Sequence, residues 1–205
     1  MRTTATVMTL QSLEGTRFSF DPGALCLQFL TTGGPSPAGR RYEILYEPDD
    51  LARWLPQSRL GLDAADVRIT TGELAAGRRM RDALWRVASA AANGEPHPGG
   101  DLAEINSTAA HPPLVPRITA DSAHAWALPA SGGQVLSTIA RDAIDLLTGH
   151  FADRIRECGG HNCALIFVDT SRPGRRRWCS MERCGNRHKV QALRARRDLA
   201  ERNGG

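Results

Sequence analysis

Long hydrophobic runs are missing from this sequence. Polar residues interrupt the apolar ones throughout the first twenty positions, so no signal-peptide core is present there, and no later stretch approaches the roughly 20 apolar residues of a membrane span. We therefore expect a globular cytoplasmic protein with no membrane partner. Because cytoplasmic thiols stay reduced, clustered cysteines are more often metal ligands than disulfides in such a protein.

Lysine and aromatic residues are also scarce. Lys189 is the single lysine among 26 basic residues, which indicates a compositional preference for arginine. Aromatic residues make up 5% of the chain, which disfavours a single-strand reader that stacks bases on aromatic rings. Acids are scarce at one place in particular: residues 171–197 hold ten basic residues and one acid, Glu182, so this segment carries +9 while the whole chain carries +4. The rest of the chain is therefore acidic, and the basic end predicts a localised polyanion-binding surface.

Apolar periodicity predicts a fold that is mainly α with short β-hairpins. Residues 1–153 form a mostly helical domain in this interpretation, a sensor or dimerisation module. Helices are expected at 25–30, 47–55, 71–92, 101–110 and 134–147, and a hairpin at 114–119 and 124–128. The longest helix is expected to begin at a capping Thr71 and to place its arginines mainly on the outer faces. These are Arg78, Arg79, Arg81 and Arg86.

Four of the five cysteines fall near the end of the chain in two pairs of equal spacing. Cys158 and Cys163 are separated by four residues, as are Cys179 and Cys184, with fifteen residues between the pairs. Two such pairs brought together by a hairpin supply the tetrahedral sulfur ligands of one structural zinc ion, Zn²⁺, with no position left for catalytic water. His161 as a replacement ligand and two disulfides are the alternatives.

The segments around these cysteines predict a small domain at 154–205. A Gly159-Gly160 knuckle is followed by a strand at 164–169, a returning strand at 176–178 and a helix from Asn186 to about Glu201, an order that resembles a treble-clef finger. About fifty residues with one apolar strand cannot fold alone, so zinc supplies on the order of 10 kcal/mol of folding free energy. We expect chelation to unfold this end and leave the helical domain intact.

The last helix is predicted to bind nucleic acid. Its Val190 and Leu193 are expected to pack inward while basic and amide side chains face outward, where they attract phosphates and read base edges. Arginines of the hairpin that precedes this helix are expected to contact the sugar–phosphate backbone of the nucleic acid. The alternative is an ordinary solvated face. The predicted contact residues are Arg175, Arg176, Arg177, Asn186, Arg187, Lys189, Gln191, Arg194, Arg196 and Arg197.

At these positions the sequence resembles a known family. The segments Phe167 to Arg172, Arg176 to Met181, and Cys184-Gly185-Asn186-Arg187 with Lys189 following are similar to the CGNR zinc finger of bacterial proteins. The layout of Leu25-Cys26-Leu27, Trp54 and the 74–87 helix is similar to the ABATE domain that precedes this finger. The resemblance implies a zinc role for the four cysteines, a DNA-facing helix from Gly185 onward, and a stress-induced transcription regulator.

Three classes of function stay open at this point. The first is a DNA-binding regulator that forms a homodimer on a palindromic site, with RNA binding as a variant of the same hypothesis. The second is a protein-interaction module whose finger docks an acidic partner. An enzyme is not expected, because the histidines form no metal-spaced pair and Cys26 lies in an apolar run typical of a buried residue. Trp54, Trp85 and Trp126 are candidates to line a small-molecule site in the helical domain.

Overall fold

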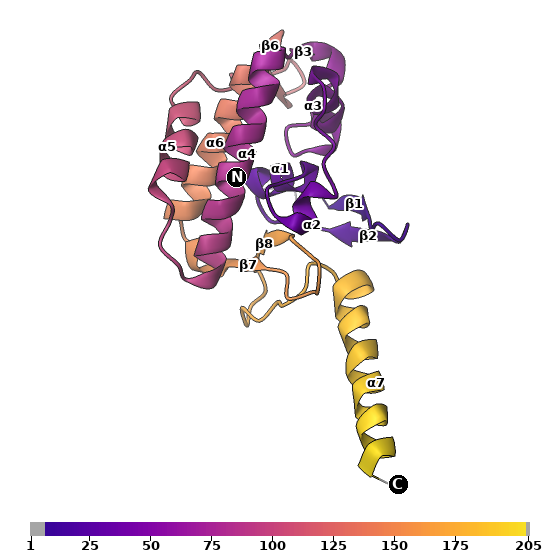
Figure 1. Ribbon diagram of the computed structural model, residues 1–205. Helices are drawn as coiled ribbons and strands as arrows, with labels where there is room; N and C mark the ends of the chain where they lie inside the picture. The colour runs from indigo at the N-terminus through magenta and orange to yellow at the C-terminus, as the bar shows by residue number, and fades with distance from the viewer. Residues whose placement is uncertain (1–6, 204–205) are drawn as a thin grey trace.

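The computed structural model describes the backbone of residues 7–203 and the side chains of residues 7–196. A helical body fills one end of the molecule, the cysteine-rich segment lies beneath it, and the last helix projects away from both (Figure 1). The fold is mainly α with short two-stranded sheets, as predicted from the sequence.

Three long helices form the body. They are α4 (Thr71–Asn93), α5 (Gly99–Ala109) and α6 (Gly132–Thr148), which pack against one another side by side (Figure 1). Their facing sides bury Leu84 and Val87 from α4, Ile105 from α5 and Ile139 from α6. Gly77 permits the close approach of α4 to α6, because a Cβ there would lie 3.0 Å from a methyl of Leu136. These helices follow the apolar periodicity of the sequence.

Helix ends are set by capping residues. Thr70, not the predicted Thr71, caps α4, because its hydroxyl accepts the Glu73 N–H while the Glu73 carboxylate accepts the Thr70 N–H at 2.8 Å. The same Glu73 carboxylate accepts the Gly133 N–H at 2.7 Å in the first turn of α6. One side chain therefore satisfies backbone donors at the starts of two helices.

The N-terminal part packs on this bundle. It consists of the antiparallel strands β1 (Met8–Gln11) and β2 (Arg17–Phe20), then α1 (Leu25–Phe29), η1 (Leu30–Thr32), α2 (Pro37–Arg40), α3 (Pro48–Trp54), η2 (Leu55–Gln57) and η3 (Ala64–Asp66). The expected helices at 25–30 and 47–55 are present as α1 and α3. Strand β1 was not predicted. Cys26 on α1 is fully buried, and burial, reinforced by the neighbouring Asp142 carboxylate, raises the pKa of its thiol.

Short strands complete the fold. Parallel β3 (Val67–Arg68) and β6 (Ala130–Ser131) tie α6 to the chain before α4, and β4 (Pro116–Ile118) with β5 (His124–Trp126) forms the predicted hairpin. After η4 (Ala152–Arg154), strands β7 (Ile155–Glu157) and β8 (Ile166–Val168) pair antiparallel, followed by a π-type turn, η5 (Met181–Gly185), and α7 (Asn186–Asn203).

Arg81 is a correction to the predicted outer face of α4. Its side chain is 1% exposed and its guanidinium donates to both oxygens of Glu43, at 2.9 and 2.7 Å, and to the Thr32 carbonyl. A residue two turns into an amphipathic helix was expected in solvent, but the Glu43 loop folds over this position and supplies a partner. Gly33 leaves the space for the pair, because a Cβ there would lie 2.8 Å from each of them.

Candidate metal centre and basic helix

The four predicted cysteines converge on one point. The sulfur atoms of Cys158, Cys163, Cys179 and Cys184 all lie within 4.8 Å of one another, and the Cys163 and Cys179 sulfurs are 3.9 Å apart. Ligands at about 2.3 Å from a tetrahedral zinc are about 3.8 Å from each other, so the cluster has the size that zinc requires. All four thiols are free of disulfides, and His161 is exposed on the knuckle outside the cluster.

The electrostatics of the cluster favour a cation. The neighbouring thiols lower the pKa of Cys158, whereas a thiolate at Cys158 raises the pKa of Cys179, because a second bare thiolate would be repelled. Four thiolates can coexist here when a divalent ion neutralises them. The donor set and its burial therefore fit one structural zinc ion.

Groups around the sulfurs hold them in place. The Cys179 N–H donates to the Cys158 sulfur at 3.2 Å, and the Arg183 guanidinium lies 3.8 Å from the Cys163 sulfur. Such outer contacts orient the ligands and offset the negative charge of a zinc tetrathiolate.

Strands β7 and β8 position the first cysteine pair at the tip of their hairpin. The Cys158 N–H donates to the Leu165 carbonyl and the Cys163 N–H to the Gly160 carbonyl, which closes the knuckle. Asn162 has a φ of 58°, so it makes the left-handed turn that the two glycines were expected to provide. Gly160 allows the knuckle to approach the Cys184 sulfur closely, because a Cβ there would lie 2.6 Å from that sulfur.

The predicted returning strand at 176–178 is wrong. Among the described residues β8 pairs with β7 alone, and Arg176 to Trp178 runs as an irregular segment fixed by the Gly159 N–H, which donates to the Arg177 carbonyl at 3.0 Å. The turn before it is organised by Asp169, which the sequence analysis did not single out. Its buried carboxylate accepts the Ser171 and Arg176 N–H groups, and although burial opposes ionisation, the Ser171 contacts lower the pKa of Asp169.

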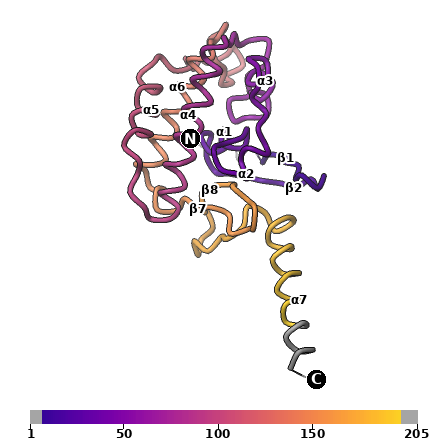
Figure 2. Tube along the Cα trace, viewed as in Figure 1, coloured from indigo at the N-terminus to yellow at the C-terminus, as the bar shows by residue number. Residues whose placement is uncertain are grey.

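The sulfur cluster shares its hydrophobic surroundings with the N-terminal hairpin. Phe18 and Phe20 of β2 are buried together with Phe167 of β8 and three of the cysteines. The indigo strands are drawn beside the orange finger (Figure 2), with which they share this cluster. On the β7–β8 hairpin of the finger, Ile155 and Ile166 belong to the main core of the body. Residues far apart in sequence therefore build the metal centre.

Helix α7 leaves the finger through η5 and carries the basic charge outward. The described side chains of α7 include exposed Arg187, Lys189, Arg194 and Arg196 and no acid. His188 packs on Trp178 with ring centroids 4.8 Å apart, which anchors the first turn. The expected inward packing of Val190 and Leu193 is wrong, because these side chains are 47% and 50% exposed. The helix projects beyond the body, so the described part of the chain leaves about half of each side chain open to solvent.

The predicted nucleic-acid contacts divide into four groups. Arg176 is a correction, because its guanidinium donates to the Asp21, Trp178 and Cys179 carbonyls and stacks over Phe167 at 4.0 Å, so its charge is used inside the finger. Arg187 is exposed and forms an ion pair of 3.4 Å with Glu14 of the β1–β2 turn. The Arg197 side chain lies outside the described residues. The exposed remainder is Arg175, Arg177, Asn186, Lys189, Gln191, Arg194 and Arg196.

Fold and site together define a helical domain that carries a four-cysteine zinc finger with a projecting basic helix. The chain belongs to the ABATE family: the family model, described as "Putative stress-induced transcription regulator", matches residues 23–150, and the CGNR zinc finger model matches residues 154–197. The resemblance noted in the sequence is thereby confirmed. A comparison with curated proteins found no match.

No helix in the part of the chain that the structure describes is both long and apolar enough for a membrane crossing.

Proposed function

We propose that this protein is a DNA-binding transcription regulator of the bacterial cytoplasm that responds to stress and contacts duplex DNA through α7. The observation that carries the proposal is the projection of α7 from the zinc centre with basic and amide side chains exposed over its first three turns and no acid among its described side chains. An α-helix of this kind fits the major groove, where Arg, Asn and Gln read base edges. The zinc fixes the base of the helix and takes no chemical part. We assign no catalytic role to the chain.

The proposal distinguishes residues within the finger. Arg194 and Lys189 are exposed and can reach phosphates. Arg175 and Arg177 are exposed on the finger and would contact the sugar–phosphate backbone of the DNA. Arg176 is not a DNA contact in this proposal, since its guanidinium is engaged by backbone carbonyls.

The test is salt-dependent DNA binding by the zinc-loaded protein. Replacing Arg194 by Ala should weaken binding and reduce the slope of log K against log salt by about 0.9, the value for one phosphate contact. Arg68→Ala is the matched control, because Arg68 on β3 is exposed at the end of the molecule opposite α7 (Figure 1). Equal slopes for the wild type and the Arg194 variant, with zinc retained, would contradict the role of α7.

A second function is favoured by the exposed Val190 and Leu193 beside the basic residues. They would suit docking of an acidic protein partner with apolar side chains of its own, or contact between two copies in a homodimer. Leu193→Ser separates the cases, because it should leave the affinity for duplex DNA per bound protein unchanged while weakening protein capture or shifting the sedimentation of the protein toward monomer.

A further inference from the structure

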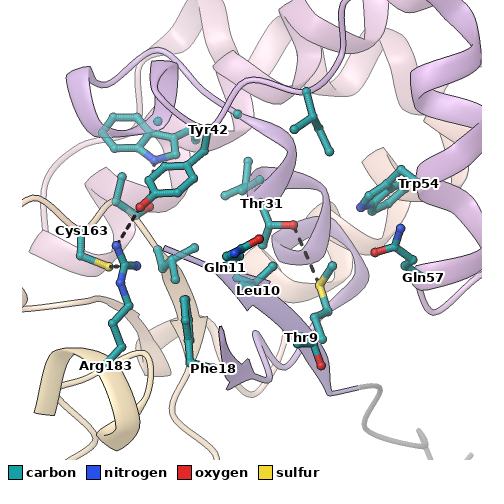
Figure 3. Close-up of a pocket in the computed structure, with 18 residues that line it drawn as sticks. Thr9, Leu10, Gln11, Phe18, Thr31, Tyr42, Trp54, Gln57, Cys163 and Arg183 are labelled. Atoms are coloured by element: carbon teal, nitrogen blue, oxygen red, sulfur yellow. Dashed lines mark hydrogen bonds between the residues drawn. The ribbon is translucent and has the colours of Figure 1, made fainter. Parts of the chain in front are cut away.

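A cavity lies where the body, the N-terminal hairpin and the finger meet. Its volume is about 220 Å³, and apolar side chains from all three parts line it. Figure 3 shows Trp54 and Gln57 along one side and Tyr42, Cys163 and Arg183 along the other. Of the three tryptophans proposed from sequence as pocket residues, Trp54 and Trp85 line this cavity, whereas Trp126 does not, since its indole N–H donates to the Leu60 carbonyl at 2.9 Å.

Two hydrogen-bond donors that line this cavity have no acceptor among the described residues. The Tyr42 hydroxyl accepts from Arg183 at 2.9 Å and from the Leu13 N–H at 3.3 Å, so its own proton has no acceptor among the described residues. The buried Trp54 indole N–H also has no partner in the part of the chain that the structure describes. Arg183 is cationic, and no carboxylate of the described chain lines the cavity. A ligand that carries an oxygen acceptor would satisfy these groups, and a cation would meet Arg183 unfavourably.

Size narrows the class of ligand. A dry apolar cavity of about 150 Å³ holds one benzene ring, and ordinary drug-sized sites begin at about 300 Å³. We propose that this cavity binds a molecule of one aromatic ring bearing one acceptor group, a ketone or a carboxylate. The site is separate from the DNA-binding proposal and does not depend on it.

The cavity also connects the finger to the body. Cys163 is a ligand of the metal centre, and Arg183 precedes Cys184 in the turn that leads into α7. A ligand that packs on Trp54 and Trp85 on the body side and on Arg183 on the finger side adds contacts between the two parts. Occupancy should therefore stabilise the zinc-bound finger by linkage, since the ligand binds the folded arrangement.

The experiment uses the zinc-loaded full chain and four probes: acetophenone, benzoate, toluene and benzylammonium. Two-dimensional NMR resolves the indole N–H signals of the four tryptophans. Acetophenone and benzoate should give saturable shifts at Trp54 and Trp85 while Trp126 stays unchanged, and toluene should bind about fivefold more weakly, the effect of one hydrogen bond. Benzylammonium should not bind. Absence of saturable binding, or equal shifts at Trp126, would overturn the site.

Two variants and one matched control locate the binding. Ile44→Trp fills the cavity from a side chain that is 47% exposed and so tolerates enlargement, and it should abolish binding. Tyr42→Phe should lower acetophenone affinity about fivefold. Tyr46→Phe, the same change at the chain's other tyrosine, which is 71% exposed and outside the cavity, should have no effect. Wild-type affinity in Ile44→Trp would overturn the assignment.

The link to the finger is tested by zinc release. Acetophenone at saturation should slow the transfer of zinc to EDTA in the wild type and leave the rate unchanged in Ile44→Trp. Equal rates with and without acetophenone in the wild type would overturn the coupling. Because no DNA is present in these assays, a negative result for DNA binding and a negative result here are distinguishable.

Discussion

At the scale of single residues, the buried pair of Arg81 and Glu43 is the most sensitive point of the body. The Arg81 side chain is 1% exposed and that of Glu43 is 12% exposed, and the two share a bidentate contact. Removing one partner of a buried pair leaves an uncompensated charge, which costs about 3–5 kcal/mol.

We expect Arg81→Met to lower the free energy of unfolding by about 3–5 kcal/mol, because Glu43 would stay largely buried with only the long 3.9 Å ion pair to Arg78. Urea unfolding of the zinc-loaded protein, followed by helical circular dichroism, measures the change. Arg79→Met is the control on the same helix, since the Arg79 side chain is 64% exposed and its pair with Glu104 is a surface contact. A loss in Arg81→Met no larger than that in Arg79→Met would contradict the structural importance of the pair.

Glu43 also predicts a pH dependence. Burial opposes its ionisation, but the hydrogen bonds from Arg81 and the Leu45 N–H, together with the charges of Arg81 and Arg78, outweigh burial and lower the pKa of Glu43 below its usual 4.5. The stabilisation is therefore complete above pH 4.5 and is lost as the pH falls through the folded-state pKa. The stability advantage of wild type over Glu43→Gln should shrink as the pH falls from 5 to 3. Zinc loss in acid affects both proteins alike, so a constant difference would contradict the assignment.

At the scale of elements, the turn between β1 and β2 touches the proposed DNA-binding helix. Glu14 in this turn forms an ion pair with Arg187. The hydrogen bond with Ser12 is the largest cause that lowers the pKa of Glu14, and the charge of Arg187 lowers it further. A carboxylate at this position competes with phosphates for Arg187 and repels them.

We expect Glu14→Gln to raise the affinity for duplex DNA about two- to threefold at low salt, because Arg187 is released and one repulsive charge is removed. Fluorescence anisotropy at two salt concentrations measures it. Glu95→Gln makes the same change of net charge at an exposed position after α4. An equal gain in both variants would assign the effect to net charge rather than to Arg187.

Element prediction succeeded where periodicity is long and failed where pairing is non-local. Helices α4, α5 and α6 follow from repeated apolar spacing, which is a property of the local sequence. Strands β1, β3, β6 and β7 span two to four residues each, too few to show a period, and they exist because a distant segment supplies hydrogen bonds. The strand predicted at 176–178 was misassigned for the same reason: β8 pairs with β7, a segment that precedes it in the chain.

At the scale of the whole molecule, the metal centre and the body are one packed structure. The finger contributes Ile155, Ile166 and Val168 to the main core, and the N-terminal hairpin contributes Phe18 and Phe20 to the cluster around the cysteines. The sequence-based expectation that chelation would leave everything before residue 154 intact therefore needs revision.

We expect zinc removal to loosen the β1–β2 hairpin together with the finger, because the metal fixes the sulfurs against which Phe18 and Phe20 pack. Hydrogen exchange before and after EDTA measures this. Amides of Thr9, Leu10 and residues 155–184 should lose protection, while the centres of α4 and α6 keep theirs. A hairpin that exchanges at the same rate with and without zinc would contradict the shared cluster.

The sequence by itself determined the ligands of the metal, the basic end and the long helices, because each is a local pattern of residue type and spacing. Only the tertiary structure decided how charges are used. It places Arg81 and Arg176 inside and leaves Arg194 free, since burial and partners depend on distant segments, Glu43 for Arg81 and Asp21 for Arg176. It also revealed a cavity beside the zinc centre, because packing between three distant segments creates that space.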